Sequence, residues 1–371
     1  MVESRWLRRA GPGIAVLGAM AIVATTTLGA PLRAWQPDPC SGSPRAGSPS
    51  NGTWYRLDPV IEAGALVGQR LALGAPGSDQ ARSLGLGSEA FAAGPFGGTV
   101  LVGTDDGRRS VLSLVDVGAG CAWAVGTSTD IVRRATLAPD GITLYEHRLE
   151  RTTRADLGVW RRSLDDPDSG VRVLEPIARD ARFGRTWLTD LMWSDDGATL
   201  AVESCGEIAC RFRVLSLGGG PLRTIADDRL GDIVGLTAER IVAHGACRGL
   251  PCPIIAVDLA GGAAITLHPA AGQAVLARGA DGRSSVVHEV DAAGDRLRQV
   301  DLRGRELGSV ATEPEGRRLV PGPARSGGAV EHDAGWLLFG PDGRSSLGGA
   351  TDWILRRVSD GSAVQLDEVS R

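Results

Sequence analysis

The sequence predicts an all-β protein: a six-bladed β-propeller, with seven blades possible, that follows an N-terminal signal or anchor segment and a linker. Three observations predict this fold. Apolar and cysteine positions recur every 42 or 43 residues, each repeat holds four short apolar runs, and Gly-rich turns separate these runs. The 371-residue chain contains 52 Gly, as many tight turns require.

The N-terminus predicts export. Arg5, Arg8 and Arg9 precede an apolar run over residues 13–24, the order found in signal peptides and membrane anchors. The run is shorter than the roughly 20 residues of a comfortable span, so the sequence leaves open whether the segment is cleaved or retained. We therefore expect a signal peptide or anchor over residues 1–30 and an extracytoplasmic protein, either tethered to the cytoplasmic membrane or secreted.

The composition changes twice after this segment. Residues 31–53 are rich in Pro, Ser and Gly, which predicts a flexible linker. Residues 54–371 carry the turn-separated apolar runs and are expected to form the propeller.

The repeat is clearest in its middle copies. Cys205 and Cys247 lie 42 residues apart, as do Cys210 and Cys252. An offset of 43 then carries 257–259 (Val-Asp-Leu) onto 300–302, which has the same three residues. Such a register over three copies indicates a repeat architecture.

Each copy has the pattern of a four-stranded antiparallel blade. In the best copy we expect strands over 190–194, 198–204, 211–217 and 222–225. The hairpin between the third and fourth strands recurs six times, at 114–125, 162–174, 214–225, 256–267, 300–310 and 355–366. Residues 54–90 and 318–340 fit the pattern poorly. Together they could make a seventh blade, and one of them is expected to close the ring by pairing the first and last segments.

Two turn regions resemble a known repeat. Residues 193–201 (Trp-Ser-Asp-Asp-Gly-Ala-Thr-Leu-Ala) and 137–145 (Leu-Ala-Pro-Asp-Gly-Ile-Thr-Leu-Tyr) are similar to the W-S-P-D-G repeat of TolB-like propellers. A copy at 279–282 is partial and the blade near Asp232 is degenerate. The resemblance covers about residues 85–365 and implies an exported six-bladed propeller. It implies no activity, because one fold serves many functions.

Six cysteines in an exported chain are expected to form disulfides. Cys205 with Cys210 and Cys247 with Cys252 stand at equivalent ends of second and third strands, so each pair can bridge its hairpin. Elimination leaves a bond between Cys40 and Cys121. A zinc site made from the four hairpin cysteines would need a reducing compartment, and we predict no metal.

The loops between second and third strands share one face of a propeller with the loops that lead into the next blade. Both disulfide hairpins fall on this face, which makes it the predicted binding surface; rigid loops lose less entropy on binding. Its expected contributors are Glu203, Glu207, Arg211, His244, Arg248 and Leu250. The alternative is that the disulfides only protect exposed hairpins.

The channel-side strands supply a second candidate site. Asp190 and Asp232 lie 42 residues apart, and Arg134 holds the corresponding position in the preceding blade. These three side chains could hold a cation or a small polar ligand at the channel mouth. Alternatively, they pair with each other or with backbone amides.

The sequence shows no catalytic constellation, so no catalytic residue and no cofactor are predicted. It has no G-x-S-x-G or H-E-x-x-H motif, and without lysine it has no phosphate-binding G-x-x-x-x-G-K-[ST] loop. A net charge of −4 gives no reason to expect nucleic acid as a partner.

The expected function is that of a non-catalytic binding or scaffold propeller, monomeric, with a protein or an envelope component as partner. Contact with the membrane is expected only through the N-terminal segment. The alternative is a propeller enzyme, a lyase or hydrolase, that uses Arg134, Asp190 and Asp232.

Overall fold

The structure is a computed structural model, and the chain divides into Met1–Arg33 and Ala34–Arg371. Its described residues are 38–42, 52–62, 65–74, 82–87, 90–166, 170–176, 187–206, 209–247, 249–261, 263–278, 283–290, 297–310, 317–320, 328–330, 336–341, 353–357 and 363–366. The predicted signal or anchor segment lies outside these residues. Among those described, no helix has the length and apolar character needed to cross a bilayer.

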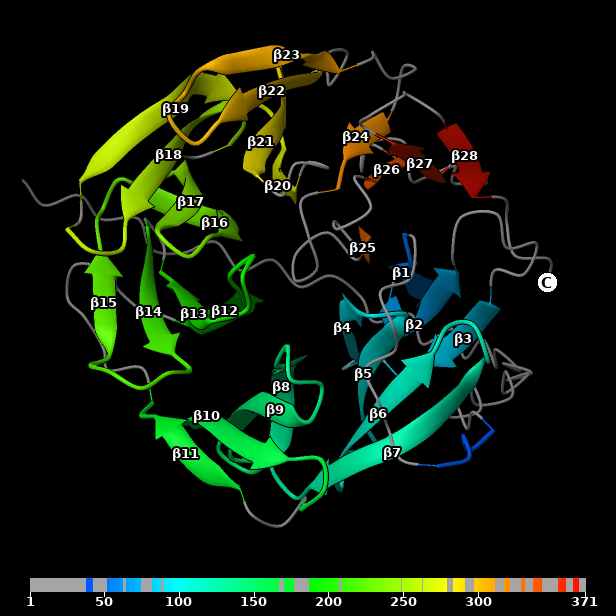
Figure 1. The fold of residues 1–371 in the computed structure, drawn as a ribbon. Helices are drawn as coiled ribbons and strands as arrows, with labels where there is room; N and C mark the ends of the chain where they lie inside the picture. The colour runs from blue at the N-terminus through cyan, green and yellow to red at the C-terminus, as the bar shows by residue number, and fades with distance from the viewer. Residues whose placement is uncertain are drawn as a thin grey trace, which may run out of the picture. The chain divides into compact units, whose positions relative to one another are not determined.

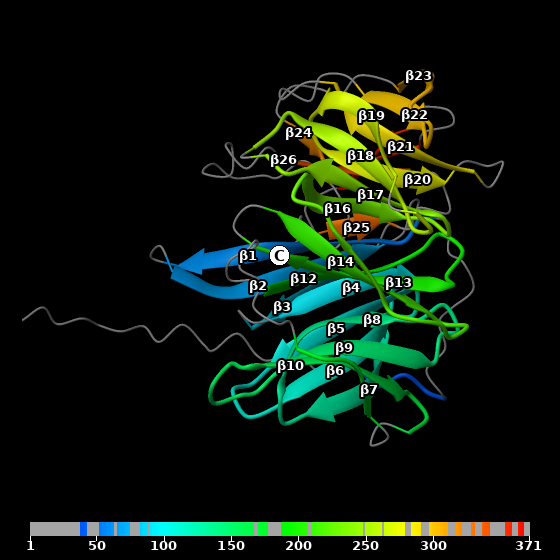
Figure 2. The same ribbon diagram turned by 90° about the vertical axis from the view of Figure 1, so that its left-hand side faces the viewer.

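The strands that the structure describes form seven antiparallel sheets of four strands, arranged as blades around a common axis (Figures 1 and 2). Five blades use consecutive strands, and the first strand of each is the innermost. The first is β4 (Phe91–Phe96), β5 (Thr99–Asp105), β6 (Ser110–Asp116) and β7 (Cys121–Ser128). The next is β8 (Ile131–Leu137), β9 (Thr143–Leu149), β10 (Asp156–Ser163) and β11 (Val171–Leu174). The third is β12 (Trp187–Trp193), β13 (Thr199–Cys205), β14 (Cys210–Ser216) and β15 (Arg223–Ala226).

Two further blades follow the same order. One is β16 (Leu230–Leu236), β17 (Arg240–Gly245), β18 (Cys252–Asp258) and β19 (Ala264–Ala271). The other is β20 (Ala274–Arg278), β21 (Ser284–Glu289), β22 (Leu297–Asp301) and β23 (Glu306–Val310). The four strands expected in the best copy lie within a few residues of β12 to β15, and all six predicted hairpins between third and fourth strands are present.

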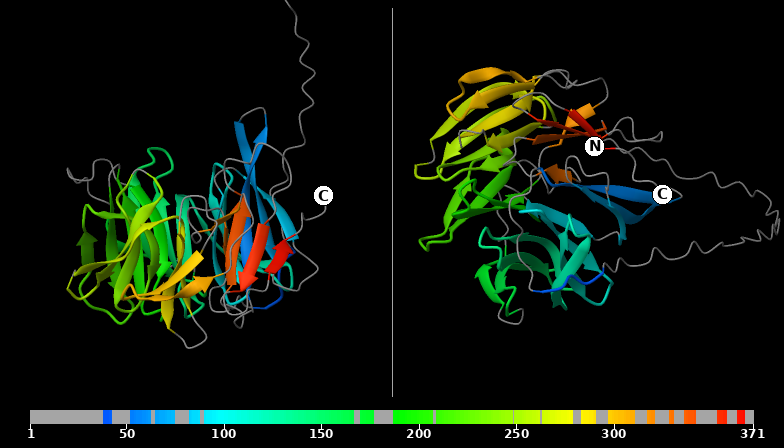
Figure 3. Two further views of the ribbon diagram at one scale, coloured as in Figure 1. Left: turned by 90° about the horizontal axis from the view of Figure 1, so that it is seen from above. Right: turned by 45° about the vertical axis from the view of Figure 1, so that its right-hand side comes forward.

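In the two remaining blades, one strand joins a sheet from the other end of the chain. One sheet contains β24 (Arg317–Leu319), β26 (Trp336–Pro341), β27 (Trp353–Arg357) and β28 (Ala363–Leu366). The other contains β1 (Trp54–Glu62), β2 (Ala65–Gly74) and β3 (Arg82–Leu86), and it takes β25 (Gly328–Val330) as its innermost strand. The orange β25 therefore lies beside the blue β1 in Figures 1 and 3.

The pairing of β25 with β1 confirms the expected closure of the ring by first and last segments. It also corrects the count of six blades, because the alternative of seven is what the described strands form. Residues 54–86 supply three strands of their own blade. The short β24 and β25 belong to different blades, so a search for four evenly spaced strands does not find them.

The turns between first and second strands depend on glycine at two positions. Gly141 and Gly197 have φ values of 72° and 70°, which residues with a Cβ rarely adopt. A Cβ on Gly197 would also lie 2.5 Å from Cγ of Pro139, in the equivalent turn of the preceding blade. These Asp-Gly turns therefore reverse the chain and let adjacent blades approach closely.

The apolar core lies between the blades. On β6, buried and partly exposed side chains alternate, as expected when one face of a strand packs more deeply than the other. One buried cluster joins Phe91 and Leu112 of the β4–β7 blade to Val132 and Leu144 of the next. Similar clusters join β12–β15 to β16–β19, and β16–β19 to β20–β23. In these pairs, each blade therefore covers the apolar face of its neighbour.

Charged side chains also join neighbouring blades. The two terminal guanidinium nitrogens of Arg151 donate to the carboxylate of Asp105, at 2.9 and 2.8 Å, across two adjacent blades. Burial alone would raise the pKa of Asp105, but the hydrogen bonds from Arg151 and Ser110 lower this pKa to about 2. Arg162 is buried against Glu146 at 2.5 Å and donates to the backbone oxygen of Val125 in the preceding blade at 2.7 Å.

Residues 38–42, inside the predicted linker, attach to the outermost strand of the β4–β7 blade. The Cys40–Cys121 disulfide joins them to β7 with Cα atoms 5.0 Å apart. The backbone N–H of Cys40 donates to the oxygen of Ala122, and that of Ala122 donates to the oxygen of Asp38, both at 3.0 Å. The indole of Trp123 donates to the oxygen of Gly42 at 3.0 Å. This part of the linker therefore has a fixed place on the blade.

Candidate functional site

The three channel-side candidates occupy equivalent positions on inner strands, as predicted. Arg134 on β8 pairs with His147, and Asp190 on β12 pairs with Glu203. Asp232 lies on β16 in the irregular stretch between Leu230 and Ile233, across from the end of β17. In all three strands the pairing register shifts close to the candidate residue.

Arg134 and Asp190 share an electrostatic environment with a residue that the sequence analysis missed. Tyr55 on β1 is buried, and burial is the main cause that raises the pKa of its hydroxyl. Asp190 raises this pKa further and Arg134 lowers it, so both charges act on the phenol. The hydroxyl of Tyr55 donates to the backbone oxygen of Ala92 at 3.2 Å. No repeat spacing points to Tyr55, because β1 lies in the irregular blade.

Asp190 also has a structural role. Its carboxylate accepts the backbone N–H of Leu191 at 2.7 Å, next to the register shift in β12. A buried N–H without an acceptor is costly, so this bond stabilises the irregular strand start. The alternative stated for this residue, pairing with a backbone amide, is thus realised.

Glu203 on β13 is fully buried, and its carboxylate connects two blades. One carboxylate oxygen accepts the backbone N–H of Ile233 on β16 at 2.7 Å, and the other accepts the hydroxyl of Thr189. The preceding blade thereby fixes the inner strand of the next.

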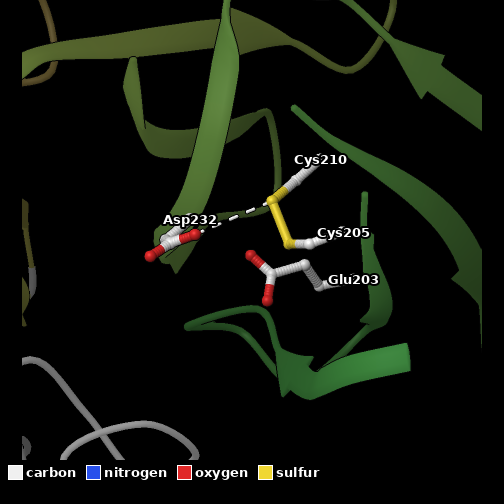
Figure 4. A group of neighbouring side chains, drawn as sticks. All are labelled: Glu203, Cys205, Cys210 and Asp232. Carbon is white, nitrogen blue, oxygen red and sulfur yellow. Dashed lines mark hydrogen bonds between the residues drawn. A yellow bond between two sulfur atoms is a disulfide. The ribbon is translucent and has the colours of Figure 1, made fainter. Parts of the chain in front are cut away.

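Glu203 and Asp232 meet at the Cys205–Cys210 disulfide, which lies directly across the β13–β14 hairpin with Cα atoms 4.0 Å apart. One ligand-type atom from each of the four residues lies within 4.8 Å of the others (Figure 4). The Sγ of Cys210 is 3.7 Å from a carboxylate oxygen of Asp232. Because a disulfide sulfur carries no hydrogen, this is a contact without a hydrogen bond. Glu203 and Asp232, predicted for two separate sites, therefore belong to one cluster.

The second disulfide hairpin differs in its surroundings. Cys247 and Cys252 are bonded, with Cα atoms 6.3 Å apart; Cys247 is exposed and Cys252 is buried. Both hairpin disulfides and the bond to Cys40 thus have the predicted partners. Arg248 and Glu207 lie outside the described residues.

Burial corrects one expectation about the disulfide loops. Glu203 is 0% exposed and His244, on β17, is 8% exposed, so neither side chain belongs to the loop surface where the sequence placed it. Both stand near the ends of second strands and point into the protein. Their role in ligand binding remains a prediction, as does that of Arg134, Asp190 and Asp232.

A second buried carboxylate repeats the geometry of Glu203. Glu289 on β21 is fully buried and accepts the backbone N–H of Leu319 on β24 at 2.8 Å. Arg318 donates to both of its oxygens, through Nε at 3.0 Å. Glu203 and Ile233 are 30 residues apart, as are Glu289 and Leu319, and this shared spacing is the signal that could have found the pair.

Comparisons with known proteins show a fold likeness only. No family model matches the chain, and no curated protein matches it. A prolyl endopeptidase structure described for inter-domain dynamics has a TM-score of 0.57 and 16% identity over 86% of this chain and 48% of its own. A puromycin-hydrolysing peptidase of Mycobacterium tuberculosis has a TM-score of 0.53 and 15% identity over 91% of this chain and 56% of its own.

TolB from Acinetobacter baumannii also matches, with a TM-score of 0.45 and 14% identity over 70% of this chain and 63% of its own. A similarity at that level carries no argument for a TolB-like relationship. The chain spans about half the length of the two peptidases. The comparisons therefore agree with the all-β propeller fold and assign no activity.

Proposed function

We propose that the protein is an exported binding propeller that engages a protein or a cell-envelope component through its disulfide-closed loops. One observation carries the proposal: adjacent blades close equivalent second-to-third-strand hairpins with Cys205–Cys210 and Cys247–Cys252. Loops fixed in this way lose little conformational entropy when a partner binds.

The hairpin between β17 and β18 offers the accessible part of this surface. Cys247, Gly249 and Pro251 are exposed, and Leu250 is partly exposed between them. An aliphatic side chain in a rigid, exposed loop suits contact with the apolar part of a protein surface.

Site-specific photocrosslinking tests the proposal. A photoreactive residue at Leu250 is compared with one at Ile142, a 45%-exposed aliphatic residue in the β8–β9 turn, at the opposite end of its blade. With envelope extract we expect one crosslinked component from position 250 and none from 142. Leu250→Asp should reduce pull-down of that component, while Ile142→Asp should not. Equal crosslinking from both positions, or none from either, would contradict the proposal.

The alternative is an enzyme that uses Arg134, Asp190 and Asp232. It is favoured by the shared electrostatic environment of Arg134, Asp190 and Tyr55. Under this alternative, Asp232→Asn abolishes turnover of any substrate that the protein consumes, and the photocrosslinking pattern stays unchanged. Undiminished turnover by that variant would show that Asp232 takes no part in the reaction.

A further inference from the structure

We propose that the Cys205–Cys210 hairpin becomes a divalent metal site when its disulfide is reduced, with Glu203 and Asp232 as the other two ligands. The bond to be broken is the sulfur–sulfur bond, and the reductant is a dithiol. The dithiol is oxidised to its own disulfide, and its two protons pass to Cys205 and Cys210. A metal ion then displaces both protons and binds two thiolates.

The geometry of the cluster carries the first step of the argument. In a tetrahedral zinc site with two thiolates and two carboxylates, ligand atoms stand roughly 3.3–3.8 Å apart. The four atoms here already lie within 4.8 Å, with Cys210 Sγ 3.7 Å from the carboxylate of Asp232 (Figure 4). In the oxidised chain the sulfurs are poor ligands, so two carboxylates alone do not complete a site. Reduction raises the number of strong ligands from two to four.

The surrounding hydrogen bonds hold one ligand in place. Ile233 N–H at 2.7 Å and the Thr189 hydroxyl fix the buried carboxylate of Glu203. Carboxylate oxygens have further lone pairs, so these bonds orient the group without using all of its acceptor capacity. Asp232 comes from the inner strand of the next blade, so the ion would connect two blades. The charge of the ion would also compensate for buried carboxylate and thiolate.

The second hairpin is a natural control. Position for position, His244 stands where Glu203 stands, because the two pair with Ile254 and Phe212, which lie 42 residues apart on equivalent third strands. Ala274 pairs as Ile233 does, so the counterpart of Asp232 is the preceding residue, Gln273. No carboxylate thus replaces Asp232 there. Among the described residues, the cluster at Cys205–Cys210 is the one group of three or more potential ligands within reach of an ion. Equal reduction of both hairpins should therefore create one site.

Cobalt(II) added to the full-length chain tests the proposal, because thiolate ligation gives charge-transfer absorption in the near ultraviolet. After anaerobic reduction by a dithiol and removal of the excess, we expect one equivalent of Co²⁺ with thiolate bands and tetrahedral visible bands. The oxidised chain should show neither. Cys247→Ser/Cys252→Ser should retain the signal, and Cys205→Ser/Cys210→Ser should lose it. Asp232→Asn, a conservative change on a partly exposed side chain, should weaken Co²⁺ binding at least about tenfold.

Equal Co²⁺ binding by the two double variants would overturn the proposal, as would unchanged affinity in Asp232→Asn. Circular dichroism checks that each reduced protein keeps its β-sheet signal. Loss of this signal on reduction, without recovery when Co²⁺ is added, would also overturn it.

Discussion

The carboxylate of Glu203 accepts the backbone N–H of Ile233 at 2.7 Å, which ties the second strand of one blade to the first strand of the next. Glu289 and Leu319 repeat this bond at 2.8 Å two blades further on. The N–H of Leu191, 42 residues before that of Ile233, is accepted by the side chain of Asp190 instead. In the blade of β8 to β11, His147 pairs with Arg134 on the inner strand. It therefore holds the position that Glu203 holds in the next blade, where Glu203 pairs with Asp190. A buried inner-strand N–H is thus satisfied either by the preceding blade or by its own strand.

Glu289→Gln should lower the free energy of unfolding by about 3 kcal/mol, because it leaves Arg318 without its buried counter-charge. Urea unfolding followed by tryptophan fluorescence measures this loss. Glu306→Gln is the matched control in the same blade: Glu306 pairs with Arg298 at 3.2 Å, and both side chains are about half exposed. We expect a loss below about 1 kcal/mol there. Equal losses would show that burial of the first pair adds nothing.

Gly235→Ala should destabilise the contact between two inner strands. A Cβ at Gly235 on β16 would lie 2.3 Å from the Cβ of Leu276 on β20, so the two backbones would have to move apart. We expect a loss of about 1–3 kcal/mol, measured by urea unfolding. Gly261→Ala is the control, since a Cβ there meets nothing within 4 Å and the residue lies in an exposed turn. A Gly235→Ala variant as stable as Gly261→Ala would show that β16 and β20 can move apart at little cost in stability.

The sequence predicts those parts of this fold that repeat. The spacing of Cys205 and Cys247, with the Asp-Gly and Gly-Gly turns, is enough to find β12 to β19 and both hairpin disulfides. The repeat spacing does not reach the blade of β1, which the sequence offers only as a possible seventh blade from residues 54–90 and 318–340. That sheet is completed by β25, which comes from more than 260 residues later in the chain. Pairing across such a distance leaves no local period.

The candidate site is predicted less completely, for a different reason. The 42-residue repeat spacing places Asp190 and Asp232 correctly on inner strands. It cannot tell which way a side chain points where the strand pairing shifts register. The sequence therefore predicts Glu203 on a loop surface, whereas the structure buries it against Ile233. Its proximity to Asp232 depends on how adjacent blades are spaced, which a single repeat does not encode.

The stability of the protein should fall on acidification in a way that depends on His288. Burial is the main cause that lowers the pKa of this fully buried imidazole, with smaller lowering effects from His268 and Arg298. The unfolded chain therefore takes up a proton near pH 6.5, where the folded chain does not. The contribution of the neutral imidazole to stability is fully present above that pH. It is lost as the pH drops from 6.5 toward the lower pKa that His288 has in the folded chain.

Melting temperatures between pH 7.5 and 5.5 measure this dependence. His288→Phe keeps a ring at the position, where His268 lies 4.3 Å away between ring centroids, and removes the proton site. We expect a shallower decline with falling pH in the variant than in the parent. Parallel declines would assign the pH dependence to other groups.

The two hairpin disulfides should differ in their rates of reduction. Cys247 is exposed, whereas Cys205 and Cys210 are 6% and 3% exposed and lie beside the carboxylates of Glu203 and Asp232, which repel an attacking thiolate. Timed reduction by a dithiol, alkylation and peptide mass spectrometry should detect free Cys247 and Cys252 first. In Asp232→Asn, Cys205 and Cys210 should be released faster than in the parent. Reduction of both pairs at one rate would contradict the effect of burial and charge.

The pairing of β25 with β1 has a consequence for how the chain folds during its synthesis. This strand lies between β24 and β26 along the chain, yet it completes the sheet of β1, whose hydrogen-bonding edge faces it. A ribosome must therefore synthesise residues up to Val330 before the first blade can be finished, and until then the edge of β1 can pair with strands of other molecules. Ring closure is thus a late event in biosynthesis, and a nascent chain that has not reached this point is open at its first blade.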